Sequence, residues 1–341
     1  MTAAFRWAAA EGRSAHLSGH VETLRPYDLV AVVMVAVAGA VLAEPQAHPV
    51  RAGLAAVAAV SACAGALYAA DHLTRHDDIL TKPHRPIPSG RLTGTTARRC
   101  AAAGAVSAVA VTWAVNWHGL FFIAAAALAQ TAYARWLKDR GLWGDLAVGL
   151  SGWTCAMLTA ATFTAPWPSA ALWPAALALG LQGTFSNTLL ALGDTGTDRA
   201  AGCRTLPVRN GPGRTLVIMT GCATACYTLT GLVPTALGRP ASPAFLGLSL
   251  TGAILATACL TLARTASRLP RATELHLYER LALPAALLTL ADHTLSALTL
   301  TTASAAILAL TPRTMLHHPA NPGPQQELHS AQVQEGTSAG G

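Results

Sequence analysis

The sequence predicts an all-α protein, a polytopic bundle of membrane-spanning helices. Hydrophobic residues make up 52% of the 341 residues and charged residues only 11%, whereas a soluble domain averages about 25% charged residues. The apolar runs are long and do not alternate with polar residues, which indicates helices rather than the strands of a membrane barrel. Their many small residues would let the helices pack closely in lipid.

Nine apolar runs of membrane-spanning length divide the chain into three parts. Residues 1–26 are a polar N-terminal arm, expected to be mobile, and residues 27–311 are the membrane domain. Residues 312–341 are rich in Pro, Gly, Gln and Ser and are expected to be disordered. The last run exceeds the thickness of a bilayer, so it is expected to tilt or to break at Pro284. The predicted spans are 27–44, 51–71, 97–116, 118–136, 142–163, 169–192, 214–236, 243–265 and 280–311.

Positively charged residues lie mainly in the loops after the even-numbered spans, whereas the loops after the odd-numbered spans contain only Arg51 and Arg239. Because cytoplasmic loops carry an excess of Lys and Arg, the N-terminus and the even-numbered loops are predicted to be cytoplasmic. An odd number of spans then places the C-terminal tail outside. We expect a multi-pass protein of the cell membrane.

Two acidic stretches directly follow apolar runs. The first reads DHLTRHDDILTKPHRPIPSGR and covers residues 71–91, and the second reads DTGTDRAAGCRTLP and covers residues 194–207. Carboxylates at the end of a membrane helix are costly and are usually kept for a function. Since both stretches are predicted to be cytoplasmic, we expect them to face one polar mouth where a metal ion and a diphosphate would meet.

In the second stretch, Asp194 and Asp198 have the i, i+4 spacing that places two side chains on one helix face. Two such oxygen ligands suit Mg²⁺, which keeps several waters and takes up phosphate oxygens. Arg199 and Arg204 follow and could hold a phosphate group. This stretch therefore predicts a site for Mg²⁺ and a diphosphate.

In the first stretch, Asp71, Arg75 and Asp78 are predicted to lie on one stripe of the helix. The two carboxylates are about 10 Å apart along the helix axis, too far to hold one metal ion together. Thr74 stands between them, where a third carboxylate would help. A basic loop that only fixes topology is the alternative interpretation, but such a loop needs no acids at the membrane boundary.

Both stretches match the signatures of a known family. DDILTKPHRPIPSGRLTG resembles the first signature of the UbiA-type intramembrane prenyltransferases, and DTGTDRAAGCRTLPV resembles the second. The resemblance covers about residues 27–311 and implies nine transmembrane helices, with motif-bearing loops after helices 2 and 6. It also implies Mg²⁺-dependent transfer of a prenyl group from a prenyl diphosphate to a lipophilic, often aromatic acceptor.

The resemblance implies roles for particular side chains. Catalytic and metal-binding roles fall on Asp71, Asp78, Asp194 and Asp198. YARWLK, residues 133–138, is similar to a tyrosine and a lysine that the family has at the end of span 4. With the arginines of the second stretch, the expected diphosphate-binding residues are Arg75, Lys82, Arg85, Tyr133, Lys138, Arg199 and Arg204.

The first signature departs from the family pattern at Ala70 and Thr74, which replace Asn and Asp, and Leu190 replaces an Asn before the second signature. These changes remove expected oxygen ligands, so two alternatives stay open. One is an intramembrane terpene cyclase, and the other is a non-catalytic lipid-binding membrane protein. A transporter fits less well because the acids gather at one face. The net charge of +7 is spread over short loops, so no nucleic-acid partner is expected.

Overall fold

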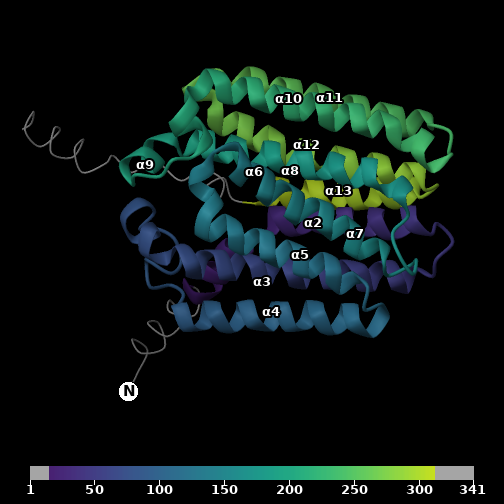
Figure 1. Ribbon diagram of the computed structural model, residues 1–341, viewed down its shortest axis with the longest axis horizontal. Coiled ribbons are helices and arrows are strands. Elements are labelled where there is room, and N and C mark those ends of the chain that lie inside the picture. Colours follow the sequence, from purple (N-terminus) through teal and green to yellow (C-terminus); the bar gives the residue numbers. More distant parts are fainter. Residues whose placement is uncertain (1–14, 312–341) are drawn as a thin grey trace, which may run out of the picture.

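The computed structural model describes residues 15–311, apart from the side chains of Asp77, Leu80 and Thr81. This part of the chain is an all-helical bundle without strands, in which the long helices run along one common direction (Figure 1). The helices are α2 Pro26–Ala43, α3 Pro49–Thr81, α4 Gly94–Val115, α5 Gly119–Ala132, α6 Leu142–Gly149, α7 Cys155–Ala161, α8 Trp173–Gly193, α9 Thr195–Ala200, α10 Leu206–Leu237, α11 Pro243–Ala263, α12 Leu269–Leu290 and α13 Thr294–Leu310. The predicted all-α class is confirmed.

Within residues 15–311, six helical stretches are long and apolar enough to cross a membrane, which supports a multi-pass membrane protein. The predicted spans 97–116 and 142–163 correspond to α4 and to α6 with α7, which also pack in the bundle. Their count as separate spans, and so the total of nine, stays a prediction. The six stretches are Pro26–Ala43, Pro49–His76, Gly119–Arg140, Ala170–Gly193, Leu206–Leu237 and Pro243–Ala263.

Local sequence explains where several helices begin. Proline occupies the first turn of α2, α3, α10 and α11, a position where its missing N–H costs no helical hydrogen bond. The Thr93 side chain accepts a hydrogen bond from the backbone N–H of Thr96 at the start of α4, and Ser242 does the same for Phe245 at the start of α11. These signals place the connecting loops at the two ends of the bundle.

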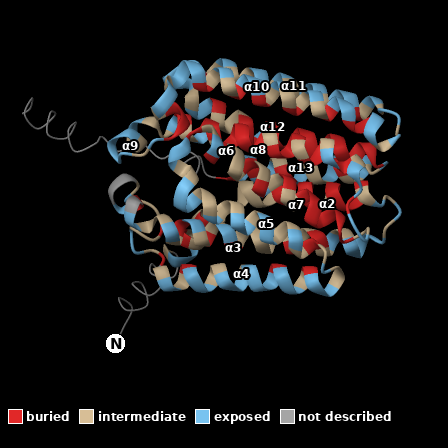
Figure 2. Cartoon of the chain, viewed as in Figure 1, coloured by how far each residue is buried: buried red, intermediate tan, exposed pale blue. Residues whose placement is uncertain are grey.

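The core lies along α2, α7, α8 and α12 (Figure 2). In α12, every residue from 279 to 290 is buried, whereas α4 and α11 expose much of their surface. Small residues allow close helix contacts, as where Gly65 of α3 faces Gly104 of α4 so closely that a Cβ on Gly104 would lie 2.8 Å from the Gly65 backbone. The charged residues Glu279 and Arg280 of α12 are therefore buried in the centre of the bundle.

The prediction of a single last span over residues 280–311 is wrong. Pro284 lies inside α12 without ending it, and the chain reverses between α12 and α13, where Asp292 adopts a left-handed backbone with φ 63°. Asp292 and His293 therefore lie in a turn rather than inside a span. His293 Nε2 is 3.3 Å from the carbonyl oxygen of Pro45, at the end of the bundle opposite the two acidic stretches.

The reversal also changes the position of the chain's last described residues. In α13, Leu308 belongs to an apolar cluster with Ala31, near the start of α2, and Leu277, in the first half of α12. Residue 311 thus lies toward the end of the bundle where α2 begins. The predicted placement of the tail across the membrane from the N-terminus concerns residues 312–341, which lie outside the described part.

The N-terminal arm is partly ordered, contrary to the expectation that all of it is mobile. Residues 15–24 are helical. Glu22 Oε2 lies 2.7 Å from Arg91 Nη1, and His20 Nδ1 lies 2.6 Å from the Tyr68 hydroxyl. These contacts hold the arm against the first acidic stretch and fix the direction in which the chain enters α2. Residues 1–14 are outside the described part.

Candidate active site

The two acidic stretches meet at one end of the bundle. The first stretch begins inside α3, which continues to Thr81, ten residues beyond the predicted span end, and it then forms the loop before α4. The second follows α8 and includes the short α9 (Figure 1). Lys82 Nζ lies 2.7 Å from Asp194 Oδ2, an ion pair that joins residues 112 positions apart. The positive side chain of one stretch therefore contacts a carboxylate of the other.

In the first stretch, Asp71 and Asp78 are both buried, each 6% exposed. Arg85 Nη1 lies 3.1 Å from Asp78 Oδ2 and 3.6 Å from Asp71 Oδ1. Arg25 Nη2 adds a further contact, 3.6 Å from Asp71 Oδ1. The two carboxylates thus converge on one guanidinium nitrogen, because their side chains reach toward each other across two helical turns.

Helix α3 is continuous through Asp71, Arg75 and Asp78, as the predicted stripe requires, but the Arg75 side chain makes a contact other than the expected one. Thr74 Oγ1 donates a hydrogen bond to Asp78 Oδ2 at 2.8 Å, so position 74 faces the acids. Arg75 instead donates to the carbonyl oxygen of His72 at 2.6 Å. The cation beside the two carboxylates is therefore Arg85, which the Pro-rich loop carries back toward the helix end.

In the second stretch, Asp194 is the C-cap of α8. The backbone N–H of Asp198 donates to the carbonyl oxygen of Asp194 at 2.8 Å, so the turn between the two aspartates is helical. Thr205 Oγ1 donates to Asp198 Oδ2 at 3.0 Å. Burial raises the pKa of the Asp198 carboxyl, an effect that the Thr205 hydrogen bond opposes. A cation bound beside Asp198 would favour its charged form and so oppose the effect of burial.

Tyr133 and Lys138 lie beside the second stretch. Residues Tyr133–Leu137 form a π-helical segment after α5, a departure from regular helix that is frequent at functional sites. The charge of Lys138 acts on Asp198. Tyr133 contacts Asn187, which donates in turn to Asp145 Oδ1 at 2.7 Å.

The two arginines of the second stretch differ from Lys82 and Arg85 in their exposure. Arg199 and Arg204 are exposed. The backbone N–H of Arg204 donates to Asp139 Oδ1 at 2.9 Å, which ties the second stretch to the loop that follows Lys138. Their predicted contacts with a diphosphate stay a prediction, whereas Lys82 and Arg85 form ion pairs with the predicted acids.

Sequence reasoning missed three groups near this mouth. Arg25 was assigned to the mobile arm, and Asp28 was passed over although it is a charge in the first turn of a membrane helix. Asn187 lies one turn before Leu190, the position where the family pattern has an Asn. A signal for all three existed, since polar side chains next to apolar runs are costly in a membrane.

The donor set fits Mg²⁺ that is bound together with a phosphate ligand. Among the described residues, no three Asp, Glu, His or Cys side chains lie close enough to form a metal site by themselves. Mg²⁺ usually takes only one or two carboxylates and completes its shell with water and phosphate oxygens. Each acidic stretch supplies such a carboxylate pair at the same mouth.

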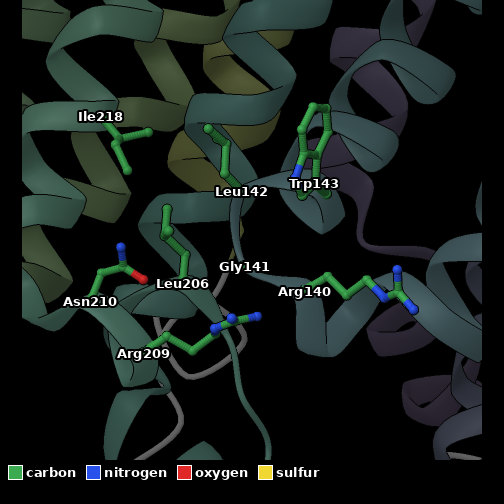
Figure 3. Close-up of a pocket in the computed structure, with 8 residues that line it drawn as sticks. All are labelled: Arg140, Gly141, Leu142, Trp143, Leu206, Arg209, Asn210 and Ile218. Carbon is green, nitrogen blue, oxygen red and sulfur yellow. The ribbon is translucent and has the colours of Figure 1, made fainter.

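A shallow pocket of about 520 Å³ lies next to the second stretch but does not contain the four aspartates (Figure 3). Arg140 and Trp143 line it at the start of α6, and Leu206, Arg209 and Ile218 line it from α10. It adjoins the candidate active site rather than forming it.

Comparison with known proteins gives the family. The model of the UbiA prenyltransferase family matches residues 32–278, so the chain belongs to this family. A digeranylgeranylglyceryl phosphate synthase of Methanopyrus kandleri is 31% identical over 216 residues, which are 63% of this chain and 78% of the relative. The bacteriochlorophyll synthase 33 kDa chain of Rhodobacter capsulatus is 33% identical over 162 residues, 44% of this chain and 52% of the relative.

Solved structures share the fold. A UbiA homolog from Aeropyrum pernix K1 superposes with a TM-score of 0.68 at 18% identity, covering 77% of this chain and 97% of that one. A homolog from Archaeoglobus fulgidus bound to DMAPP and Mg²⁺ gives a TM-score of 0.60 at 15% identity, covering 78% and 99%. At these identities the likeness concerns the fold alone.

Proposed function

We propose that this chain transfers a prenyl group from a prenyl diphosphate to a lipophilic acceptor, with Mg²⁺ bound at the mouth between its two acidic stretches. The observation that carries the proposal is the Lys82–Asp194 ion pair. It joins the cationic end of the first stretch to a carboxylate of the second, and binding of a metal–diphosphate complex by both stretches requires that they meet in this way.

Two sets of residues would stabilise the leaving diphosphate, one of cations and one of carboxylates. Lys82 and Arg85 would contact the diphosphate oxygens once the carboxylates release them, because a phosphate group competes well for both kinds of cation. The four aspartates would hold Mg²⁺, which supplies charge neutralisation for the departing pyrophosphate. Preorganised positive charge of this kind lowers the barrier because the negative charge grows as the C–O bond breaks.

The apolar core behind the mouth would receive the prenyl chain and exclude water from the allylic cation. The family resemblance implies an acceptor that is often aromatic. Several relatives are named for a glyceryl phosphate product, so a lipid alcohol becomes the second candidate acceptor. We also propose that the mouth and the N-terminus face the cytoplasm of the cell membrane, as the distribution of Lys and Arg indicates.

The test is product analysis with the full-length protein. Membranes containing it are given geranyl, farnesyl or geranylgeranyl diphosphate with Mg²⁺, with and without a cell extract that supplies acceptors, and products are identified by mass spectrometry. The expected result is a prenylated acceptor and pyrophosphate, absent from the Asp194→Ala/Asp198→Ala variant. A cyclised prenyl product would show that the protein is a terpene cyclase instead of a transferase. Bound lipid without any product would favour a non-catalytic lipid-binding protein.

A further inference from the structure

A second charged pair joins α2 to α12 next to the mouth. Arg280 Nη1 lies 2.7 Å from Asp28 Oδ1, and the guanidinium carbon lies 4.7 Å from the centre of the Trp153 ring. Arg280 is 5% exposed, whereas the Asp28 side chain keeps 20% exposure. The Asp28 carboxylate is therefore the more exposed member of the pair.

Arg25 connects this pair to the first acidic stretch. Its Nη2 contacts Asp71 at 3.6 Å, and its backbone carbonyl oxygen accepts a hydrogen bond from the N–H of Asp28 at 2.7 Å. The charges of Asp71 and Asp28 both act on Arg25. Arg25 thus contacts both Asp28 and Asp71, one of the acids expected at the diphosphate site.

The pair is incompletely satisfied by the protein. Arg280 Nε is buried and has no hydrogen-bond partner among the described residues, although a guanidinium carries five N–H donors. The guanidinium lies over the Trp153 ring, and stacking of this kind fixes its plane, so the Nε N–H is held in place without an acceptor. Trp153 lies in a second π-helical segment, Leu150–Thr154, so both irregular segments of the bundle border charged sites.

The surroundings suit an amphipathic ligand. An apolar cluster that contains Ala31, Leu277 and Leu281 packs against Tyr27 and Trp153, the neighbours of the charged pair. A polar head at Asp28 and Arg280 would therefore have apolar side chains of α2 and α12 beside it. Charged side chains inside a membrane protein are rare and usually mark a ligand or proton pathway.

We infer that Asp28 and Arg280 form the acceptor subsite for a lipid alcohol, an inference that rests on the proposed prenyl transfer. Arg280 donates to the head group of the alcohol, and Asp28 takes the hydroxyl proton. The hydroxyl oxygen forms a bond to C1 of the prenyl group while the bond from C1 to the diphosphate oxygen breaks. The electron pair of that bond leaves with pyrophosphate, so the products are a prenyl ether, pyrophosphate and protonated Asp28.

The test uses the full-length protein in lipid nanodiscs with geranylgeranyl diphosphate, Mg²⁺ and geranylgeranylglyceryl phosphate as the alcohol. Loss of a general base usually costs 10²–10⁴-fold, so Asp28→Asn should lower kcat by about 100-fold or more. Binding of geranylgeranyl diphosphate should stay within about twofold, because Asp28 acts on the acceptor. Arg280→Lys should mainly raise KM for the alcohol. Asp292→Asn, in the turn at the opposite end of the bundle, is the matched control and should match the wild type.

Exchanging the two charged residues distinguishes a role of Asp28 in proton transfer from a role of the ion pair in stability. In Asp28→Arg/Arg280→Asp the ion pair between α2 and α12 is retained, but the carboxylate moves to α12. Thermal stability should therefore be higher than in Asp28→Arg alone, while transfer stays lost. Recovery of transfer in this variant would overturn the inference, and so would wild-type turnover in a folded Asp28→Asn protein. If the wild type prenylates 4-hydroxybenzoate and no alcohol, the acceptor class is wrong.

Failure of the broader proposal gives a different result. In that case the wild type itself would neither bind geranylgeranyl diphosphate nor release pyrophosphate with any acceptor, and the subsite would fall with it. Wild-type transfer that Asp28→Asn leaves intact would overturn the subsite alone.

Discussion

The two acidic stretches differ in how their carboxylates are buried and paired with cations. In the first, Asp71 and Asp78 are buried and converge on Arg85, with Thr74 as an additional donor. In the second, the Asp194 side chain is 43% exposed, and its ion-pair partner among the described residues is Lys82 of the other stretch. A buried carboxylate matched by its own arginine is a stable arrangement, whereas an exposed one held by a mobile lysine is ready to exchange partners.

This difference assigns unequal tasks to the two stretches. The second stretch is expected to contribute most to Mg²⁺ binding, and the first is expected to add the phosphate-binding cations Lys82 and Arg85. The replacement of a carboxylate by Thr74 fits this division, because a hydroxyl that donates to Asp78 contributes no negative charge for a metal ion.

The largest effect should follow removal of the second carboxylate pair. Asp194→Ala/Asp198→Ala should lower turnover by at least about 1,000-fold, since each charged group that stabilises a leaving group typically contributes 10²-fold or more. Asp71→Ala should only reduce turnover, because Arg85 retains Asp78. Pyrophosphate release by purified protein is the measurement, with Glu44→Ala at the opposite end as control. A correctly folded and active double variant would contradict the metal assignment.

A smaller effect is expected for the cations. Arg85→Ala and Lys82→Ala should each raise the KM for prenyl diphosphate by roughly 10- to 100-fold, the value of one charge-assisted hydrogen bond. Lys82→Arg should recover part of the loss, because the charge is kept. Unchanged KM values in both alanine variants would mean that the diphosphate binds elsewhere.

Restoring the family ligands should sharpen the comparison. In Ala70→Asn/Thr74→Asp, a carboxylate would stand one turn from Asp78, so the Mg²⁺ concentration for half-maximal activity should fall several-fold, by about 1 kcal/mol of added binding. Activity is measured across a magnesium titration at fixed prenyl diphosphate. The same magnesium requirement before and after the change would mean that position 74 is not a vacant ligand position.

The smallest effect is predicted for Arg75. Because its guanidinium donates to the His72 carbonyl oxygen instead of an acid, Arg75→Ala should change KM for the diphosphate by less than about twofold, as for most surface substitutions. The measurement is the same kinetic assay with Arg85→Ala as the matched variant. A loss as large as that of Arg85→Ala would place Arg75 at the diphosphate during turnover.

The sequence allowed the helical class and the four aspartates to be predicted, because apolar runs and the acids that end them are local patterns. It did not separate Arg75 from Arg85, since only the folded Pro-rich loop decides which arginine reaches Asp78. The reversal at Asp292 was hidden because neither Gly nor Pro marks it. Arg25, Asp28 and Arg280 could not be paired, because contacts between distant helices leave no trace in a single chain's local pattern.

The central claim is that both acidic stretches act on one metal–diphosphate complex. It is tested most directly by calorimetric titration of geranyl diphosphate with Mg²⁺ into the wild type, Asp78→Ala, Asp194→Ala and the double variant. Groups that share one ligand are expected to be coupled by about 0.5–3 kcal/mol. The account predicts one binding event with such coupling between Asp78 and Asp194. Two binding events, or losses that add to within about 0.5 kcal/mol, would contradict it.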